Sequence, residues 1–328
     1  MKRTDIKITK LLNKSFQIIL PLLFGAAILI WTYYDFDFSR VHDVLFGGMR
    51  YDWMLFSLVF GVLAHLLRGW RWNLALAPLG EYPRLSNSVY AIFVSYADNL
   101  VIPRIGEVSR CGILAKYDGV SFPKSLGTVV TERIIDTVCI GLITLVTLLL
   151  QSGIFAAFFR QTGTDPTFFL RLFSSTNFYI TLLCLGAVLV GLVWMIRNLS
   201  LFVRIRGLFR NIWEGCLSVR HVQHPLLFIL YTIGIWICYF LHFYITFYCF
   251  SFSAGLGWMA GLVLFVVGSI AVIVPTPNGA GAWHFAVITM MMMYGVSKED
   301  AGIFALIVHG IQTFLVVLLG VYGLAALS

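Results

Sequence analysis

The amino-acid sequence contains six long stretches of mostly apolar residues, and these decide which kinds of fold are available to it. A helix that crosses a lipid bilayer needs roughly 20 such residues in a row. The stretches cover residues 16–34, 53–77, 124–150, 178–196, 226–250 and 301–327. Only 12% of the 328 residues are charged, about half the share found in soluble domains. The sequence therefore predicts an all-α polytopic membrane protein.

Two further apolar regions contain a break in the middle. In region 88–115 the break begins at Pro103 and continues through a polar stretch, and in region 258–294 it covers residues 275–281. Proline ends a helix and glycine permits unusual backbone angles, so each region is expected to form two half-helices around its break. Irregular backbone at membrane depth is tolerated only where it is buried in protein or lines a cavity. We therefore expect an internal cavity at the two breaks.

The distribution of lysine and arginine determines how the first broken region is threaded, because cytoplasmic loops are enriched in these residues. If residues 88–102 crossed the membrane, the two sides would carry 10 and 11 basic residues. If the region enters from the cytoplasm and returns, the cytoplasmic side carries 17 and the outside 4, with Arg68, Arg71 and Arg84 counted as one cytoplasmic loop. The second arrangement predicts about six full spans, two re-entrant helical hairpins and both termini in the cytoplasm.

The predicted elements form two halves, residues 16–150 and 178–327, with the same order of span, span, hairpin and span. The second half enters the membrane from the opposite side, which makes the pair an inverted-topology repeat. In many transporters such repeats place broken helices at corresponding positions around the substrate site. We interpret residues 1–328 as a single integral membrane domain with this internal symmetry.

The first break concentrates polar and ionisable residues in an otherwise apolar region. Its candidate binding residues are Asp98, Asn99, Arg104, Gly106, Glu107 and Arg110. A half-helix that begins near Pro103 would point free backbone N–H groups toward the bilayer centre, and Arg104 and Arg110 would add positive charge there. Since guanidinium groups match the geometry of phosphate, the pattern predicts an anion site. The alternative is a loop at the cytoplasmic surface whose charges lie in water.

Three more ionisable residues, Glu132, Arg133 and Asp136, lie inside the span 124–150. Such residues cost roughly 2.5–3.5 kcal/mol each on insertion scales and usually face a bundle interior or a wet path. Asp136 can share a helix edge with either of the other two, because the spacings are i, i+4 and i, i+3. The residues predict a charged lining beside the first hairpin, or a structural ion-pair cluster that clamps the hairpin to this helix.

The second break carries no charge apart from what a histidine provides. Its candidate site residues are Asn278, Gly279, Gly281 and His284. The glycines permit close backbone approach, and His284 is a candidate protonation switch. A hydrogen-bonded packing role is the commoner one for such a histidine, and the same two interpretations apply to His309 in the last span.

The sequence carries no motif of a soluble catalytic domain or a metal site. Its six cysteines are isolated, without metal-ligand spacing, and there is no Walker loop, dinucleotide fingerprint, HExxH or GxSxG. We therefore expect no cofactor, no metal and no ATP-driven pumping by this chain. The net charge of +8 is spread along the loops between apolar runs, so no nucleic-acid partner is expected.

Four motifs, in this order, resemble the lysylphosphatidylglycerol synthase transmembrane (flippase-like) family, and together they cover nearly the whole chain. They are RGWRWNLAL from Arg68, DNLVIPRIGEVSR from Asp98, ERIID from Glu132 and PTPNGAGAWHFAV from Pro275. The resemblance implies a polytopic protein of a bacterial-type inner membrane that moves lipids between leaflets. Position by position, it carries over to Asn99, Pro103, Arg104, Gly106, Glu107, Arg110, Glu132, Arg133, Asp136, Pro275, Pro277, Gly279 and Gly281.

The sequence departs from the family pattern in two places. Full-length synthases carry a soluble aminoacyl-transferase domain after the membrane part, whereas this sequence ends at Ser328, so we expect no synthesis of aminoacylated lipid by this chain. Many relatives also have an acidic residue after the second glycine-rich motif, where Trp283 and His284 stand here. The lipid or the mode of coupling is therefore expected to differ.

These observations lead to one main hypothesis and two alternatives. The main hypothesis is a translocase, not an enzyme, that moves a phospholipid or a polyprenyl-phosphate-linked lipid, with a second copy of the chain or a separate lipid-synthesising protein as candidate partners. The first alternative is an intramembrane lipid-modifying enzyme or accessory subunit that uses Glu107, Glu132 or Asp136 as acid or base. The second is a scaffold without a polar cavity.

Overall fold

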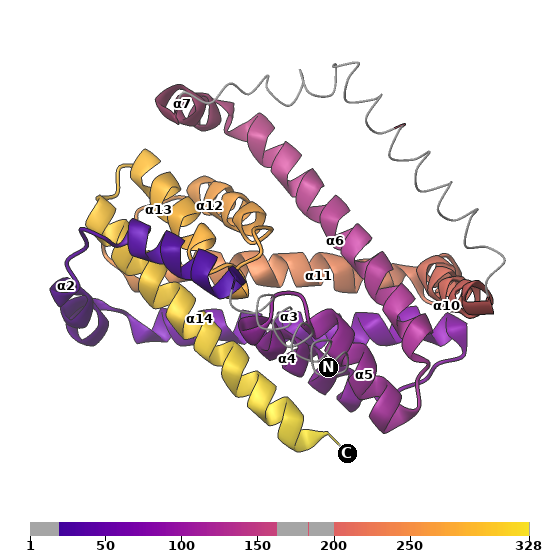
Figure 1. The fold of residues 1–328 in the computed structure, drawn as a ribbon. Coiled ribbons are helices and arrows are strands. Elements are labelled where there is room, and N and C mark those ends of the chain that lie inside the picture. Colours follow the sequence, from indigo (N-terminus) through magenta and orange to yellow (C-terminus); the bar gives the residue numbers. More distant parts are fainter. Residues whose placement is uncertain (1–19, 163–182, 184–199, 328) are drawn as a thin grey trace, which may run out of the picture.

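The computed structural model describes residues 20–162, 183 and 200–327, and every regular element in them is a helix (Figure 1). Four of these helices, with their short extensions, are long and apolar enough to cross a membrane: Tyr51–Leu79, Phe122–Leu150, Pro225–Cys249 and Lys298–Ala326. This finding agrees with the prediction of an all-helical, multi-pass membrane protein.

The four long helices coincide with four of the predicted spans. They are α3 (Tyr51–Leu76), which η2 (Ala77–Leu79) continues, α6 (Phe122–Leu150), α11 (Pro225–Tyr244), which η4 (Ile245–Cys249) continues, and α14 (Lys298–Ala326). A shorter apolar helix, Leu20–Thr32, covers the described part of the predicted span 16–34. The predicted span 178–196 lies outside the described residues, apart from residue 183. The full number of spans therefore stays a prediction.

Each broken region forms two short helices that pack against each other. The first consists of α4 (Leu85–Val101) and α5 (Gly106–Asp118), and the second of α12 (Trp258–Ala271) and α13 (Ala282–Met293), with the short helix η5 (Pro277–Gly279) in its break. The helix α5 begins at Gly106, three residues later than the sequence suggested, so Arg104 precedes the helix. We call α4 with α5 the first hairpin and α12 with α13 the second hairpin.

The remaining described elements connect or cover these helices. They are α2 (Ser39–Asp43), η1 (Val44–Gly48), α7 (Ser152–Thr162), α10 (Ser200–Leu217) and η3 (Ser218–His221). The helix α10 crosses α6 where two glycines meet, because a Cβ atom on Gly127 would lie 2.1 Å from the carbonyl oxygen of Ile212. Glycine at such crossings lets two helix backbones approach closely.

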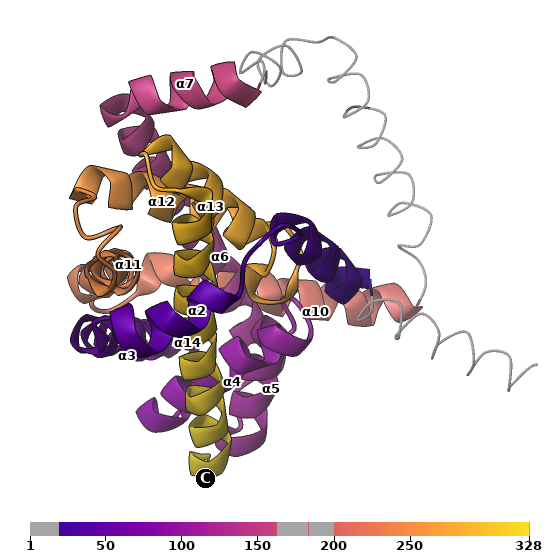
Figure 2. The ribbon, with the colours of Figure 1, turned by 90° about the vertical axis from the view of Figure 1, so that its left-hand side faces the viewer.

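The two halves of the chain meet along α3 and α11, which lie side by side in both views of the ribbon (Figures 1 and 2). Around this pair, α14 packs against α4 of the first hairpin, and α6 packs against α12 of the second hairpin. In the predicted inverted repeat, α4 corresponds to α12 and α6 to α14, so the contact of α14 with α4 corresponds to the contact of α6 with α12. The repeat itself, and the passage of the hairpins into the bilayer, stay predictions.

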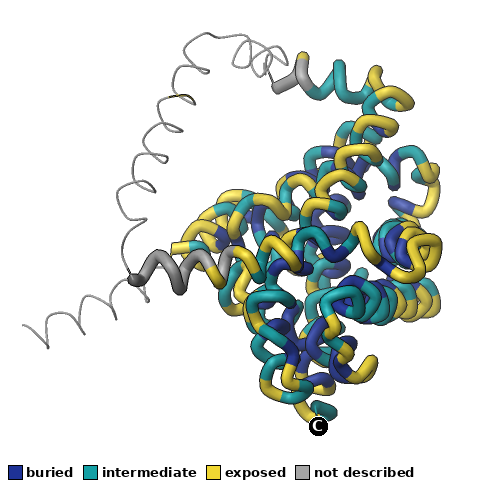
Figure 3. Tube along the Cα trace, turned by 90° about the vertical axis from the view of Figure 1, so that its right-hand side faces the viewer, coloured by how far each residue is buried: buried dark blue, intermediate teal, exposed yellow. Residues whose placement is uncertain are grey.

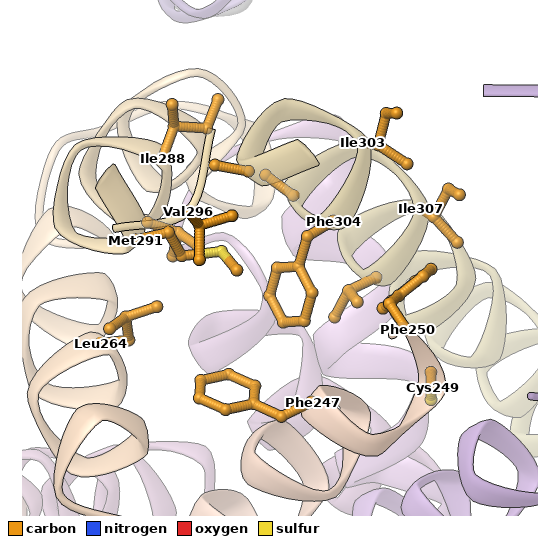
Figure 4. Close-up of a cluster of buried hydrophobic side chains, with 14 of the residues drawn as sticks. Phe247, Cys249, Phe250, Leu264, Ile288, Met291, Val296, Ile303, Phe304 and Ile307 are labelled. Carbon is orange, nitrogen blue, oxygen red and sulfur yellow. The ribbon is translucent and has the colours of Figure 1, made fainter. Parts of the chain in front are cut away.

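An aromatic core fills the space between α11, α14 and the second hairpin (Figure 4). The rings of Phe247 and Phe304 pack edge-to-face there with centroids 5.4 Å apart, and Leu264 and Met291 belong to the same cluster. The burial pattern along the chain shows buried positions on the inner faces and many exposed positions on the outer faces (Figure 3). Since many of the exposed side chains are large and apolar, the outer surface suits a lipid environment.

Candidate functional site

A buried cluster of charged side chains joins α3 to α6. Arg68 Nη1 lies 2.7 Å from Asp136 Oδ2, and Arg71 Nη2 lies 3.1 Å from Asp136 Oδ1 and 3.3 Å from Glu132 Oε1. The two arginines lie one helical turn apart on α3, and the two carboxylates lie one turn apart on α6, so each pair occupies one face of its helix. These faces meet, and all four side chains are buried.

The first hairpin contributes a third arginine to this cluster. Arg110 of α5 donates from Nη2 to Glu132 Oε2 over 2.7 Å, and its guanidinium carbon lies 4.6 Å from the ring centroid of Trp72. The Trp72 indole N–H in turn donates to Thr128 Oγ1 at 2.9 Å. The expected availability of Arg110 for an external anion is therefore not what the structure shows, because this side chain is buried and paired inside the protein.

Two hydrogen bonds connect the cluster to α11. Arg71 Nη1 donates to Thr232 Oγ1 at 3.3 Å, and Arg68 Nε donates to the Tyr239 hydroxyl at 3.2 Å. The Tyr239 hydroxyl also lies 2.8 Å from the hydroxyl of Tyr96 on α4. The cluster thus joins α3, α5 and α6 and is connected to α11 and α4, so both the first hairpin and the second half of the chain hold it in place.

The buried members of this group, which we call the ion cluster, do not balance in charge. Three guanidinium groups, of Arg68, Arg71 and Arg110, face two carboxylates, of Glu132 and Asp136, which leaves one positive charge in excess. Uncompensated charge in a low-dielectric interior is costly. The ion cluster therefore has an electrostatic preference for one more anion.

The edge of the ion cluster is its most accessible part. Arg133 has a side chain that is 41% exposed, and its Nη2 lies 3.2 Å from Asp136 Oδ2. On its other side, Arg133 Nε lies 3.7 Å from Glu107 Oε1 at the start of α5. Since this second contact is long, Arg133, which borders the ion cluster, is well placed to turn toward a ligand.

The first break is closed by short-range packing. Gly106 donates its backbone N–H to Asn99 Oδ1 at 2.9 Å, and a Cβ atom on Gly106 would lie 1.9 Å from the carbonyl oxygen of Ser95. Only glycine fits at this crossing of α4 and α5. Asp98 is half-buried beside the break, and its carboxylate has no hydrogen-bond or ion-pair partner among the described residues.

One side chain reaches from the first break to the second. Arg104 adopts a positive φ of 65°, which is unusual for a residue with a side chain, and its Nη2 donates to the carbonyl oxygen of Ile273 at 3.3 Å. Ile273 stands just after α12, where the second break begins. The α4 helix also contacts η5 inside that break. The two breaks therefore lie against each other, and the cavity expected there stays a prediction.

The second break is held to α14 by uncharged polar groups. Asn278 Nδ2 donates to Thr313 Oγ1 at 2.8 Å, and the Asn278 carbonyl oxygen lies 3.2 Å from His309 Nε2. His284 Nδ1 accepts the backbone N–H of Gly281 at 3.4 Å. Gly279 and Gly281 have positive φ values of 71° and 85°, which glycine adopts readily.

An apolar cavity of about 360 Å³ lies beside the second hairpin. The residues around it are Phe24, Ile28, Trp31, Phe158, Val267, Ala271, Val274, Ala282, Phe285, Ala286, Thr289 and Met290. They come from helix Leu20–Thr32, α7, α12 and α13, and from the start of the second break. With one threonine as its sole polar side chain, this lining suits hydrocarbon.

The predicted site residues thus fall into three places. Glu107, Arg110, Glu132, Arg133 and Asp136 meet in or beside the ion cluster. Asp98, Asn99, Arg104 and Gly106 stand at the first break, and Asn278, Gly279, Gly281 and His284 stand at the second. Among the described residues, no three side chains of the metal-binding types lie together as a metal site would require.

Sequence reasoning missed the two arginines at the centre of the ion cluster. Arg68 and Arg71 were expected in a cytoplasmic loop, but both are buried inside α3. They are ionisable residues within an apolar stretch, and the same observation marked Glu132 and Asp136 as interior on α6. The same test applied to residues 53–77 would have found them, because two arginines on one face of a span need buried partners.

Comparison with known proteins gives one result. The search of curated proteins and the search of solved structures each found no match. The family model described as the lysylphosphatidylglycerol synthase TM region matches residues 18–320. This match covers nearly the whole chain and includes all four motifs, both hairpins and the ion cluster, so the protein belongs to this family of membrane proteins.

Proposed function

We propose that this protein moves an anionic lipid between the two leaflets of a cytoplasmic membrane. In this proposal the head group passes along the contact between the two hairpin breaks and interacts with the edge of the ion cluster, while the acyl chains stay in the apolar surroundings. The substrate class is a phospholipid or a polyprenyl-phosphate-linked lipid.

The excess positive charge of the ion cluster is the observation that carries this proposal. A lipid phosphate near Arg133 would offset that charge at the accessible edge of the cluster. Binding there needs only the long contact between Arg133 and Glu107 to open. A charge-assisted hydrogen bond to phosphate contributes about 1.5–3 kcal/mol. This is more than the 3.7 Å ion pair between Arg133 and Glu107 contributes at its half-exposed position.

The contact between the breaks supports the route of the head group. Half-helices that meet at the centre of a transporter expose backbone N–H and carbonyl groups that do not pair within a helix. Here the Arg104 side chain reaches from the first break to the second and donates a hydrogen bond to the Ile273 carbonyl oxygen. An arriving phosphate would compete for the Arg104 guanidinium, so binding and separation of the two breaks are coupled.

The apolar cavity beside the second hairpin supports the placement of an acyl chain. Its volume of about 360 Å³ is in the range of small ligand pockets. Phe24 and Ile28 border it from helix Leu20–Thr32, and Val267 and Phe285 from the second hairpin. A lipid with its tail there would have its head group near the second break.

Acid–base catalysis at the same carboxylates is less well supported. Glu132 is held by Arg71 and Arg110, and Asp136 by Arg68, Arg71 and Arg133. A carboxylate fixed by several guanidinium groups is a poor proton acceptor, because each positive neighbour favours its ionised form. We therefore prefer transport over an intramembrane lipid-modifying reaction.

The experiment is transport of fluorescent lipid in proteoliposomes that contain the purified protein. We expect the wild type to transfer labelled phosphatidylglycerol between leaflets faster than labelled phosphatidylcholine. Replacing Arg104 and Arg133 together by alanine should lower the phosphatidylglycerol rate by about tenfold or more, since the loss of one charge-assisted bond of 1.4 kcal/mol already corresponds to tenfold.

The matched control is Arg40→Gln. Arg40 forms two ion pairs, with Glu299 and with Asp300, near the surface and away from both breaks. The transport rate of this variant should equal that of the wild type. Wild-type rates from the double variant would refute the assignment of the site. Equal, background-level transfer of all lipids by the wild type would refute the function.

A further inference from the structure

Two histidines lie in contact at the second break. The imidazole centroids of His284 on α13 and His309 on α14 are 4.6 Å apart, and Trp283 lies 5.2 Å from His309. Transport of an anionic head group, as proposed above, uses neither ring. The hydrogen bonds of the two rings indicate which of them can accept a second proton.

The hydrogen bonds of His309 are compatible with one proton or with two. Its Nε2 faces the Asn278 carbonyl oxygen at 3.2 Å, so this nitrogen carries a hydrogen and donates it. Its Nδ1 lies 3.5 Å from Thr313 Oγ1, which already accepts a hydrogen from Asn278. A hydroxyl both donates and accepts, so a second proton on His309 requires only that the Thr313 hydroxyl hydrogen turn away.

The neighbouring ring of His284 is restricted to the neutral form in this conformation. Its Nδ1 accepts the backbone N–H of Gly281 at 3.4 Å. A proton on Nδ1 would set two N–H groups against each other and would place positive charge at the N-terminus of α13, which the helix dipole disfavours. His309 is therefore the proton acceptor of the pair.

Few titratable or charged groups face His309 from the elements around it. Tyr33, which follows helix Leu20–Thr32, lies 5.9 Å from the His284 ring, and α12 carries no titratable side chain. From α11, His242 is connected to α14 by Gln312, which donates to its carbonyl oxygen. The α4 helix, which packs against this break, ends near Asp98 and Arg104.

We propose that His309 is a proton-binding site, and that proton uptake there is coupled to the opening of the second break. A charged imidazole in this apolar surrounding is costly, so protonation favours a conformation in which the ring reaches water. The Asn278 carbonyl and the Thr313 hydroxyl both move with that change, because they connect the break to α14. A proton gradient would thus bias which conformation the lipid site adopts.

The proton site is tested by NMR on histidine-labelled protein in lipid nanodiscs. We expect one interior imidazole of the wild type to change its protonation state within the pH range in which the protein stays folded, and this signal to vanish in His309→Gln. The variant Thr313→Val, which keeps the shape but removes the hydroxyl, should shift that titration. As a control, His42→Gln removes an exposed histidine and should leave the interior signal unchanged. Absence of any interior titration would overturn the site.

The coupling is tested in the proteoliposome assay with a pH difference across the vesicle membrane. The wild-type rate should change by up to about tenfold per pH unit, the ratio of proton activities, and His309→Gln should lose this response. An unchanged response in His309→Gln, or none in the wild type, would overturn the coupling. This part rests on the proposed lipid transport; if no lipid is moved at all, that function fails, and with it the coupling, while the NMR titration still decides the proton site.

Discussion

Single residues matter in this protein because charge is so scarce. In a soluble domain an arginine on a helix is usually hydrated, and its loss is minor. Here Arg68, Arg71 and Arg110 are almost fully buried, and each lies within 2.7–3.3 Å of a carboxylate oxygen. A buried pair does little for stability compared with an apolar substitute of the same shape, but removal of one partner leaves the other charged and unpaired.

Arg71 provides the clearest test of this point. Its side chain is completely buried and bonds to Glu132, Asp136 and Thr232. The substitution Arg71→Leu should lower the free energy of unfolding by about 1–3 kcal/mol, because Glu132, Asp136 and Thr232 each lose a buried hydrogen-bond partner. Thermal unfolding of the purified protein in detergent measures this loss.

The comparison is Arg50→Leu, which breaks an exposed pair with Asp52 near the start of α3. That pair is hydrated on both sides, so the unfolding temperature should hardly change. Equal losses from the two substitutions would mean that the ion cluster contributes no more than a surface pair.

At the scale of elements, glycines decide how the helices cross. Gly127 brings α6 and α10 together, Gly106 brings α4 and α5 together, and Gly320 brings α14 to Ala97 of α4, where a Cβ atom would lie 2.3 Å from the Cβ of Ala97. In a membrane, helix association depends on close packing, since lipid tails are as apolar as the side chains. These crossings place the hairpins against the long helices.

Two glycines of α5 make a matched pair for an experiment. Gly106→Ala should destabilise the protein by roughly 1–3 kcal/mol or more, because the new Cβ would meet the Ser95 carbonyl at 1.9 Å and push the first hairpin apart. Gly112 has no atom within 4 Å of the corresponding position, so Gly112→Ala should stabilise by about 0.5–1 kcal/mol through helix propensity.

Unfolding of both variants in detergent, together with the lipid transport rate, distinguishes packing from propensity. If Gly106→Ala were as stable as Gly112→Ala, the tight crossing of α4 and α5 would be disproved.

At the scale of the whole molecule, the open question is which loops face the cytoplasm. With Arg68, Arg71 and Arg110 buried in the protein, they no longer count as loop charges, and the predicted cytoplasmic total of 17 falls to 14 against 4 outside. The excess of basic residues therefore stays on the predicted cytoplasmic side. The orientation with both termini inside therefore remains the prediction, since the remaining basic residues are still far more numerous on that side.

Labelling of single cysteines tests this orientation in intact cells. Phe46 and Tyr82 are 69% and 73% exposed and lie in loops predicted on opposite sides of the membrane. In a variant without the native cysteines, Phe46→Cys should react with a membrane-impermeant maleimide in intact cells. Tyr82→Cys should react only after the membrane is opened, and the reverse result would invert the topology.

The class of the protein and the positions of its four long helices could be predicted from the sequence. Runs of about 20 apolar residues leave a chain few alternatives to spanning helices, because every backbone polar group must be paired inside the bilayer. The proline and glycine residues likewise indicated where each broken region is interrupted, because proline has no backbone N–H donor and glycine allows a positive φ. Glu132 and Asp136 were recognisable as interior from their place in a span.

Which charged side chains meet could not be predicted from the sequence, because it depends on how the helices pack. Arg71 and Glu132 are 61 residues apart in the chain, and Arg104 and Ile273 are 169 residues apart, so no local pattern relates them. Their contacts depend on which helix faces turn toward each other and how closely the glycine crossings let the backbones approach. The same packing paired Arg110 inside the protein, left Arg133 at the accessible edge, and set His309 beside His284.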